Sequence, residues 1–220
     1  MNYCRFLLLL LLPANLLLAQ NIKPPFRDDI NSFKKHDSIH FPGTNKILFV
    51  GSSSFTKWTD VQNYFPSFPI INRGFGGSSL TDVIRYADEI IFPYQPKQIV
   101  IYCGENDLAA YDTVTGQIVF NRFIQLFDRI RKKLPGVPVA FISLKPSPSR
   151  WNLKDKMMDA NKRIKKFLKK KKATIFIDVY HKMLGKDGTP IKEIFLDDHL
   201  HMNEKGYQIW QKLIEPHLLK

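Results

Sequence analysis

The stretch ILFVGSSS, residues 47–54, is a short apolar run that ends in a glycine and three serines. A run of this length, bounded by turn-forming residues, is typical of a strand that is buried on both faces. The pattern recurs in QIVIYCGEND, residues 98–107, where glycine and three polar residues follow the apolar run. Two such strands predict a parallel sheet whose following polar residues lie together at one edge.

Three further runs of this kind occur, and helical patterns separate them. The expected strands are residues 47–51, 69–74, 98–104, 138–144 and 173–179. Amphipathic helices are expected from Leu80, around Phe120 and Met157, and after a capping Asn203. Parallel strands joined by helical crossovers have both faces of their sheet covered. The sequence therefore predicts an α/β fold, a three-layer α/β/α sandwich around a five-stranded parallel sheet.

Local signals mark the ends of several elements. Ser79 and Asp82 have the spacing of a capping box, and Pro93 is expected to end the same helix. A short helix is expected within residues 55–65. A short amphipathic turn around Ile30 is expected to pack on the domain.

Length and composition fit one globular domain. The chain has 220 residues, of which 44% are hydrophobic and 24% charged, which excludes a disordered, collagen-like or multi-span membrane protein. We expect this domain over residues 45–220, after a polar lead-in over residues 21–44. The two cysteines, Cys4 and Cys103, do not make a disulfide framework. The apolar neighbours of Cys103 predict a buried free thiol.

Residues 1–20, MNYCRFLLLLLLPANLLLAQ, have the layout of a secretory signal peptide. The apolar run from Phe6 to Ala19 has 14 residues, fewer than the roughly 20 that a membrane-spanning helix needs. We therefore expect a periplasmic or secreted protein after cleavage. Leu17 stands where a small residue is preferred, which leaves an uncleaved N-terminal membrane anchor as the alternative.

The chain is strongly basic, with 33 Lys and Arg against 20 Asp and Glu and a formal net charge of +13. The positive charge is concentrated around Lys162–Lys172. This segment predicts either contact with an anionic surface, of phospholipid head groups or acidic glycan, or a solvated helix face. Nucleic acid is not an expected partner, because no binding motif occurs and the leader indicates export.

Four segments with chemically useful residues lie near the expected strand ends. They are Gly51-Ser52-Ser53-Ser54, the glycines of residues 74–77, Gly104-Glu105-Asn106-Asp107, and Asp198-His199-Leu200-His201. Because the carboxyl ends of parallel strands meet at one edge, we expect these segments to converge. A serine becomes a nucleophile when an adjacent base takes its proton, and a carboxylate can orient that base. Nearby amides can bind the oxyanion of an acyl-transfer intermediate.

The order of the four segments resembles the SGNH (GDSL-type) hydrolases over residues 45–218, and NRGFGGS, residues 72–78, resembles their platelet-activating-factor acetylhydrolase-like branch. The resemblance implies a flavodoxin-like sandwich and an ester hydrolase that uses no metal or other cofactor. It implies Ser53 as nucleophile, His201 as base and Asp198 as the partner of His201. The oxyanion donors that it implies are the backbone N–H groups of Ser53 and Gly77 and the side-chain amide of Asn106.

One departure from the family pattern leaves alternatives open. Ser52 stands where the family has an aspartate, so Ser52 and Ser54 are alternative nucleophiles to Ser53. His199 is an alternative base, but Leu196, three residues before it, cannot orient an imidazole. No distant cluster of acids or histidines completes a metal site at this segment.

Two further residues are candidate substrate contacts. Arg73 either contacts substrate or makes a structural ion pair, and Trp151 either stacks on a sugar or acyl group or anchors the next helix. The sequence thus predicts an exported serine esterase that removes short O-acyl groups, such as acetyl, from carbohydrate or lipid. The alternative is a non-catalytic binding protein that uses the same fold and its basic face to hold an acidic glycan or a membrane.

Overall fold

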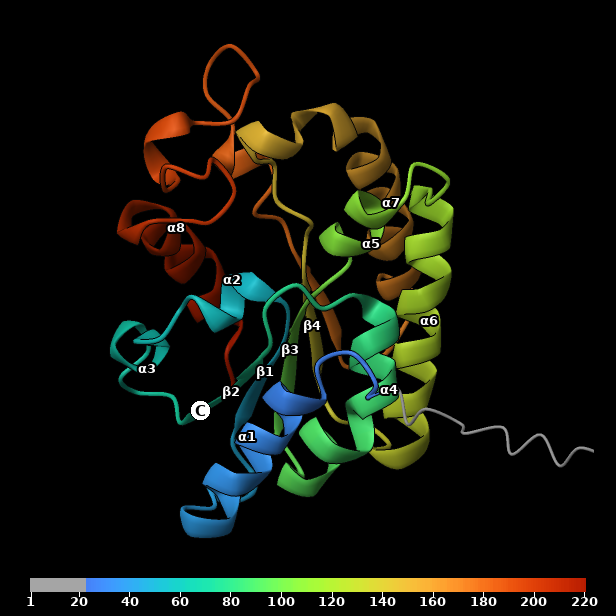
Figure 1. The fold of residues 1–220 in the computed structure, drawn as a ribbon, viewed down its shortest axis with the longest axis vertical. Helices are drawn as coiled ribbons and strands as arrows, with labels where there is room; N and C mark the ends of the chain where they lie inside the picture. The colour runs from blue at the N-terminus through green and yellow to red at the C-terminus, as the bar shows by residue number, and fades with distance from the viewer. Residues whose placement is uncertain (1–22) are drawn as a thin grey trace, which may run out of the picture.

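The computed structural model describes residues 23–220, so the expected signal segment lies outside the described residues. Its five strands form one parallel sheet in the order β2-β1-β3-β4-β5 (Figure 1). The strands are β1 Ile47–Gly51, β2 Ile70–Gly74, β3 Gln98–Tyr102, β4 Val139–Ile142 and β5 Thr174–Ile177. All five expected strands are confirmed, most of them a few residues shorter than expected. This order is flavodoxin-like, and its switch point lies between β1 and β3.

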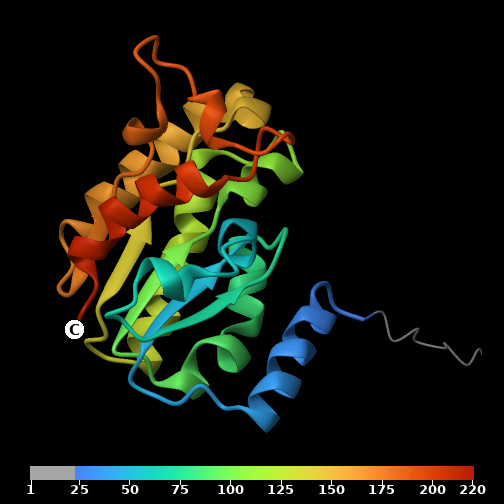
Figure 2. The same cartoon turned by 90° about the vertical axis from the view of Figure 1, so that its left-hand side faces the viewer.

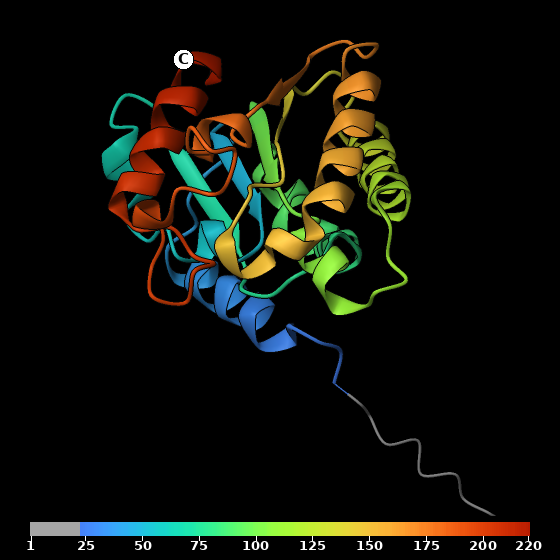
Figure 3. The ribbon, with the colours of Figure 1, turned by 90° about the horizontal axis from the view of Figure 1, so that it is seen from above.

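Helices cover both faces of the sheet, as Figure 3 shows from above, so the expected three-layer sandwich is confirmed. The longer helices are α1 Arg27–Ile39, α4 Leu80–Ile90, α6 Gly116–Lys133, α7 Lys154–Leu168 and α8 Glu204–Ile214. The short helices are α2 Ser53–Thr56, α3 Val61–Tyr64 and α5 Glu105–Ala110. The 3₁₀ turns are η1 Phe92–Tyr94, η2 Pro148–Leu153, η3 His181–Met183, η4 Lys192–Ile194 and η5 Glu215–His217.

Each face of the sheet has its own apolar core. On one face α1, α4, α6 and α7 pack against the strands, and on the other α2, α3 and α8 do so. Trp58 and Trp210 are fully buried in the second core, and the ring of Trp58 stacks on Tyr207 with 4.6 Å between centroids. Among residues 23–220, no helix combines the length and the apolar character that crossing a bilayer requires.

Side-chain caps start the two helices that follow segments with site residues. The Ser79 hydroxyl accepts a hydrogen bond from the Asp82 N–H, and the Asp82 carboxylate accepts one from the Ser79 N–H, so the expected capping box is confirmed. Asn203 caps α8 by accepting from the N–H of Gly206. These bonds satisfy N–H groups that the first helical turn leaves free, and they fix where each helix begins.

The lead-in forms a helix of 13 residues, α1, instead of the short turn expected around Ile30. Figure 2 shows α1 beside α4. The guanidinium of Arg27 donates to both oxygens of Glu89 at 2.9 Å, and the Tyr86 hydroxyl donates to the Pro25 carbonyl at 2.6 Å. The turn was expected because few apolar residues mark this helix, whereas polar contacts to α4 hold it.

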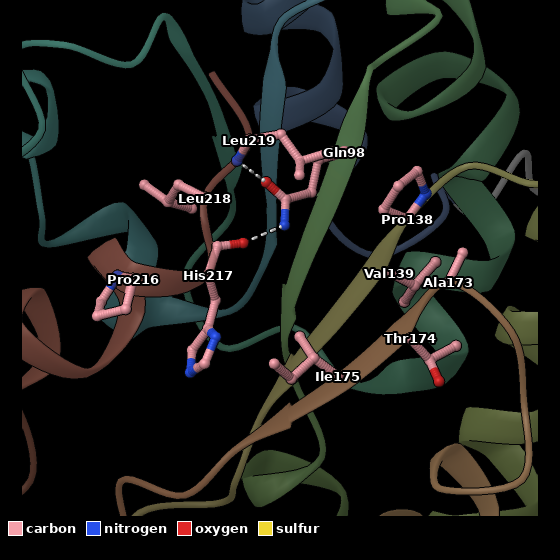
Figure 4. A pocket seen from close by; sticks show the side chains of 10 residues that line it. All are labelled: Gln98, Pro138, Val139, Ala173, Thr174, Ile175, Pro216, His217, Leu218 and Leu219. Carbon is pink, nitrogen blue, oxygen red and sulfur yellow. Dashed lines mark hydrogen bonds between the residues drawn. The ribbon is translucent and has the colours of Figure 1, made fainter.

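A cavity of about 290 Å³ lies at the amino ends of β3, β4 and β5 (Figure 4). The Gln98 side chain donates to the His217 carbonyl at 2.7 Å and accepts from the Leu219 N–H at 2.9 Å. These bonds hold the C-terminal segment against the sheet. The cavity is therefore at the opposite end of the strands from the serines that follow β1.

Candidate active site

Three side chains from distant parts of the chain meet beyond β1. Oγ of Ser53, the first residue of α2, lies 3.0 Å from Nε2 of His201, although 148 positions separate them. Nδ1 of the same imidazole lies 2.5 Å from Oδ2 of Asp198. Because a carboxylate only accepts, Nδ1 carries the proton and Nε2 is free to accept from the serine hydroxyl. The expected convergence of Ser53, His201 and Asp198 is thus what the structure has.

The end of β1 requires glycine at position 51. Gly51 has φ +150°, and a Cβ there would lie 1.9 Å from the carbonyl oxygen of Tyr102 on the neighbouring strand. The N–H of Ser52 donates to that same carbonyl at 3.1 Å. Ser52 and Ser54 are buried, whereas Ser53 is half-buried and faces the imidazole. Of the three serines, Ser53 is therefore the one placed for chemistry.

Hydrogen bonds hold the carboxylate of Asp198 in its charged form. Its Oδ1 accepts from the backbone N–H groups of Leu200 at 2.9 Å and His201 at 2.8 Å. Burial raises the pKa of Asp198, but the bonds from the His201 ring and from these N–H groups outweigh it and lower the pKa to about 2. The partner of the imidazole is therefore an anion at all physiological pH values.

The loop that carries these residues is braced by its own backbone. The N–H of Leu196 donates to the His201 carbonyl at 2.8 Å. His199 adopts a left-handed φ of 54°, and its carbonyl accepts from the N–H and hydroxyl of Ser149 at 3.1 and 3.0 Å. Within residues 23–220, the His199 ring makes no hydrogen bond. The structure therefore gives His201 the place beside Ser53 and gives His199 a backbone role.

The three expected oxyanion donors come from the ends of β1, β2 and β3. The backbone N–H groups of Ser53 and Gly77 have no protein acceptor among residues 23–220. Gly77 is exposed and has a left-handed φ of 82°, a conformation that favours glycine. Nδ2 of Asn106 donates one hydrogen to the Ser78 carbonyl at 2.9 Å, and nothing else within residues 23–220 accepts its second hydrogen.

Arg73 does not contact this site, so its interpretation as a substrate-binding residue is corrected. Its guanidinium lies 2.5 Å from the carboxylate of Asp37 and donates to the hydroxyl of Tyr94 at 2.7 Å. The group also lies over the rings of Phe33 and Tyr94, and the residue is only 7% exposed. Arg73 instead makes a structural ion pair with Asp37, the other alternative, and this pair links β2 to α1.

Trp151 lies on η2 and is half-buried against the first core. The ammonium group of Lys154 lies 5.2 Å from the centre of its ring. These contacts agree with an anchor for α7, and stacking on substrate stays a prediction.

Sequence reasoning missed a buried charged cluster beside Asn106, which we call the Glu105 cluster; it consists of Tyr102, Glu105, Lys145 and Arg150. Glu105 is 3% exposed and Lys145 1%. The Glu105 carboxylate lies 3.1 Å from Nζ of Lys145 and 3.1 Å from Nη1 of Arg150. It also accepts a hydrogen bond from the Tyr102 hydroxyl. Burial raises the pKa of Glu105, but the two cations and this hydroxyl lower it below its usual range. Charged residues directly after buried strands were the signal in the sequence.

Other reactive groups do not compete with Ser53 in the described part of the chain. Cys103 is a free, fully buried thiol, as expected, and burial raises its pKa well above the usual range. A thiol in this state is not a nucleophile. Within residues 23–220, no three His, Cys, Asp or Glu side chains gather in a way that could hold a metal ion.

Comparisons with known proteins identify one matching family and several similar folds. The family model described as the GDSL-like lipase/acylhydrolase family matches residues 37–209. A structure from Streptococcus pneumonia, described as a candidate platelet activating factor, has a TM-score of 0.76 at 20% identity, covering 87% of this chain and 92% of that one. A GDSL-like lipase from Bacteroides thetaiotaomicron has a TM-score of 0.73 at 20% identity, with 86% and 96% covered.

A third structure with a similar fold has a lower sequence identity to this chain. A mutant of an acetyl-xylooligosaccharide esterase from Geobacillus has a TM-score of 0.62 at 14% identity, covering 79% of this chain and 94% of that one. A comparison with curated protein sequences gives no match.

Proposed function

The chain belongs to the GDSL-like lipase/acylhydrolase family and is a carboxylic ester hydrolase, and we propose that it removes short O-acyl groups, acetyl above all, from carbohydrate or lipid. The observation that carries the proposal is the hydrogen-bonded series Ser53, His201 and Asp198. The acyl preference is supported by the fold shared with an acetyl-xylooligosaccharide esterase. Export is part of the proposal and rests on the pattern of residues 1–20.

In the proposed reaction, Oγ of Ser53 attacks the ester carbonyl carbon while its proton passes to Nε2 of His201. The negative charge of Asp198 stabilises the imidazolium that forms. The carbonyl oxygen becomes an oxyanion, which the N–H groups of Ser53 and Gly77 and the free N–H of Asn106 would bind.

The intermediate then expels the alcohol, which takes the proton from the His201 imidazolium, and an acyl group remains on Ser53. Water then attacks the carbonyl carbon of this acyl-enzyme and gives a proton to His201. The second tetrahedral intermediate breaks down, which releases the carboxylic acid and returns the proton from His201 to Ser53. Two successive additions thus use one base and one oxyanion site.

A serine-directed phosphonate distinguishes an esterase from a non-catalytic binding protein of the same fold. The activated hydroxyl of Ser53 should displace the leaving group of the phosphonate, because His201 takes its proton. We expect mass spectrometry of a protease digest to locate the adduct on Ser53 and nitrophenyl acetate hydrolysis to stop in proportion to labelling. An adduct on Ser52 or Ser54 would contradict the assignment, and an unlabelled, inactive protein would favour the binding alternative.

The basic segment Lys162–Lys172 supports a second part of the proposal, contact with an anionic surface. Beside it lies a cavity of about 640 Å³ with apolar side chains of Met158 and Phe176. Lysines line the same cavity: Lys162, Lys165, Lys166 and Lys169. Two carboxylates, Asp159 and Asp178, line it as well, so its rim is cationic by excess. An apolar hollow with a net cationic rim suits amphiphiles with anionic head groups, whereas a merely solvated helix face needs no hollow.

Charge reversal tests this contact. The triple variant Lys166→Glu, Lys169→Glu, Lys170→Glu should bind vesicles of anionic phospholipid at least about tenfold more weakly, since each surface lysine contributes about 1 kcal/mol. The matched control, Lys35→Glu, Lys186→Glu, Lys205→Glu, alters three exposed lysines elsewhere and has the same net charge. Equal weakening in both variants would show a general charge effect and refute a specific surface. An acidic polysaccharide in place of vesicles tests the glycan source.

A further inference from the structure

Two cations contact the single carboxylate of Glu105 in the Glu105 cluster. Lys145 already neutralises Glu105, lying 3.1 and 3.3 Å from its two oxygens, and Tyr102 adds a hydrogen bond. Arg150 brings a second cation to the same carboxylate at 3.1 Å. Buried charges are costly to desolvate, and replacing them by apolar groups is often neutral or stabilising. Arg150 adds a second favourable charge interaction to Glu105, and its remaining donors are available for another contact.

Arg150 connects this cluster to the proposed oxyanion site. Its Nη1 faces Glu105, and its Nη2 donates to Oδ1 of Asn106 at 2.9 Å. The planar guanidinium can make both contacts at once because its donors form a rigid fork. With 19% of its side chain exposed, Arg150 lies between the buried cluster and the surface.

The hydrogen bond from Arg150 acts on the amide in two ways. It fixes the oxygen of Asn106 away from the oxyanion site, as the bond from Nδ2 to the Ser78 carbonyl also does. Because the donor is a cation, the bond also draws electron density towards Oδ1 and makes the free N–H of Asn106 a stronger donor. The stronger N–H donor stabilises the negative charge that develops on the carbonyl oxygen in the transition state. Because the bound ester does not yet carry this charge, the interaction lowers the barrier to reaction.

We propose that Arg150 is a positioning residue for ester hydrolysis, which holds and polarises the Asn106 amide while Glu105 and Lys145 hold Arg150. The inference rests on the proposed function of Ser53 and Asn106. It assigns the cluster a role in the chemical step in addition to its role in packing.

A double-mutant cycle tests the proposal. Arg150→Ala should lower kcat for nitrophenyl acetate about 10- to 100-fold and change KM less than about threefold. In the Asn106→Ala background, the same change should cost less than about threefold, because the amide through which Arg150 acts is gone. Arg150→Lys should not restore the rate, since one ammonium group cannot bridge Glu105 and Asn106. Millimolar guanidinium should partly restore Arg150→Ala.

Two controls separate this role from folding and from the proposed function. Arg163→Ala removes an arginine that pairs with Asp159 on α7, and its kcat should stay within about twofold of wild type. Thermal unfolding of each variant reports the loss of packing. Equal kcat losses for Arg150→Ala with and without Asn106 would overturn the Arg150 proposal alone. A wild-type protein with neither turnover nor a Ser53 phosphonate adduct would overturn the proposed function and this inference together.

Discussion

Replacing Ser53 with alanine is expected to lower kcat for nitrophenyl acetate by at least about 10³-fold, with the fold intact. The hydroxyl of Ser53 is the group that faces Nε2 of His201 at 3.0 Å, and the acyl-enzyme cannot form without it. The methyl group of alanine fits the half-buried position, so unfolding temperature should change little. Steady-state kinetics and a thermal melt measure the two effects.

Ser54→Ala is the matched control for this prediction, because it removes the same atom one position along the chain. Ser54 is buried and makes no hydrogen bond to His201 in the structure. Its kcat should stay within about threefold of wild type. Full activity in Ser53→Ala, or loss of activity in a folded Ser54→Ala, would show that Ser53 is not the nucleophile.

The sheet was predictable because each strand has a local sequence signal, a short apolar run bounded by turn-forming residues. The run from Ile47 to Gly51 is fully buried on both faces. An apolar stretch this short that ends in glycine favours a strand over a buried helix, which is longer. The capped start of α4 at Ser79 was equally readable, since a capping box needs only four residues. Helix α5, from Glu105 to Ala110, was missed because six residues are too few to show a helical period.

The relative positions of the site residues were predictable from topology and not from local pattern. Ser53 and His201 lie far apart in sequence, but parallel strands deliver their following loops to one edge. The choice of His201 over His199 followed from the spacing to Asp198, which an i, i+3 hydrogen bond now explains. The conformation of His199, with its left-handed φ, was not readable from any residue type.

Pairings between distant side chains could not be predicted. Arg73 is next to the glycines of the site in sequence, yet on a strand its side chain points to the face covered by α1, where Asp37 holds it. Glu105 lies in one of the segments expected near a strand end, but only the tertiary structure brings Lys145 and Arg150 to it from beyond β4. One sequence records which charges exist but not which of them meet.

Asp198 should not limit the activity of the wild-type enzyme on mild acidification. The pKa of Asp198 is about 2 in the folded protein, below the ordinary value near 4, so its charge is present above this range and lost only as pH falls through about 2. Loss of the Asp198 charge should therefore lower kcat only near pH 2 to 3. A titration of this carboxyl group at or above pH 4 would contradict the hydrogen bonds that hold its charged form.

Asp198→Asn is expected to lower kcat about 10³- to 10⁴-fold while the protein remains folded. The asparagine amide cannot supply the charge that stabilises the His201 imidazolium, and it can turn its NH₂ group to Nδ1, which puts the proton on Nε2 and blocks proton transfer from Ser53. Asp197→Asn is the matched control, because it makes the same change at the adjacent exposed carboxylate, and its kcat should stay within about twofold. Equal losses in the two variants, or an active Asp198→Asn, would contradict the role of Asp198 as the partner of the base.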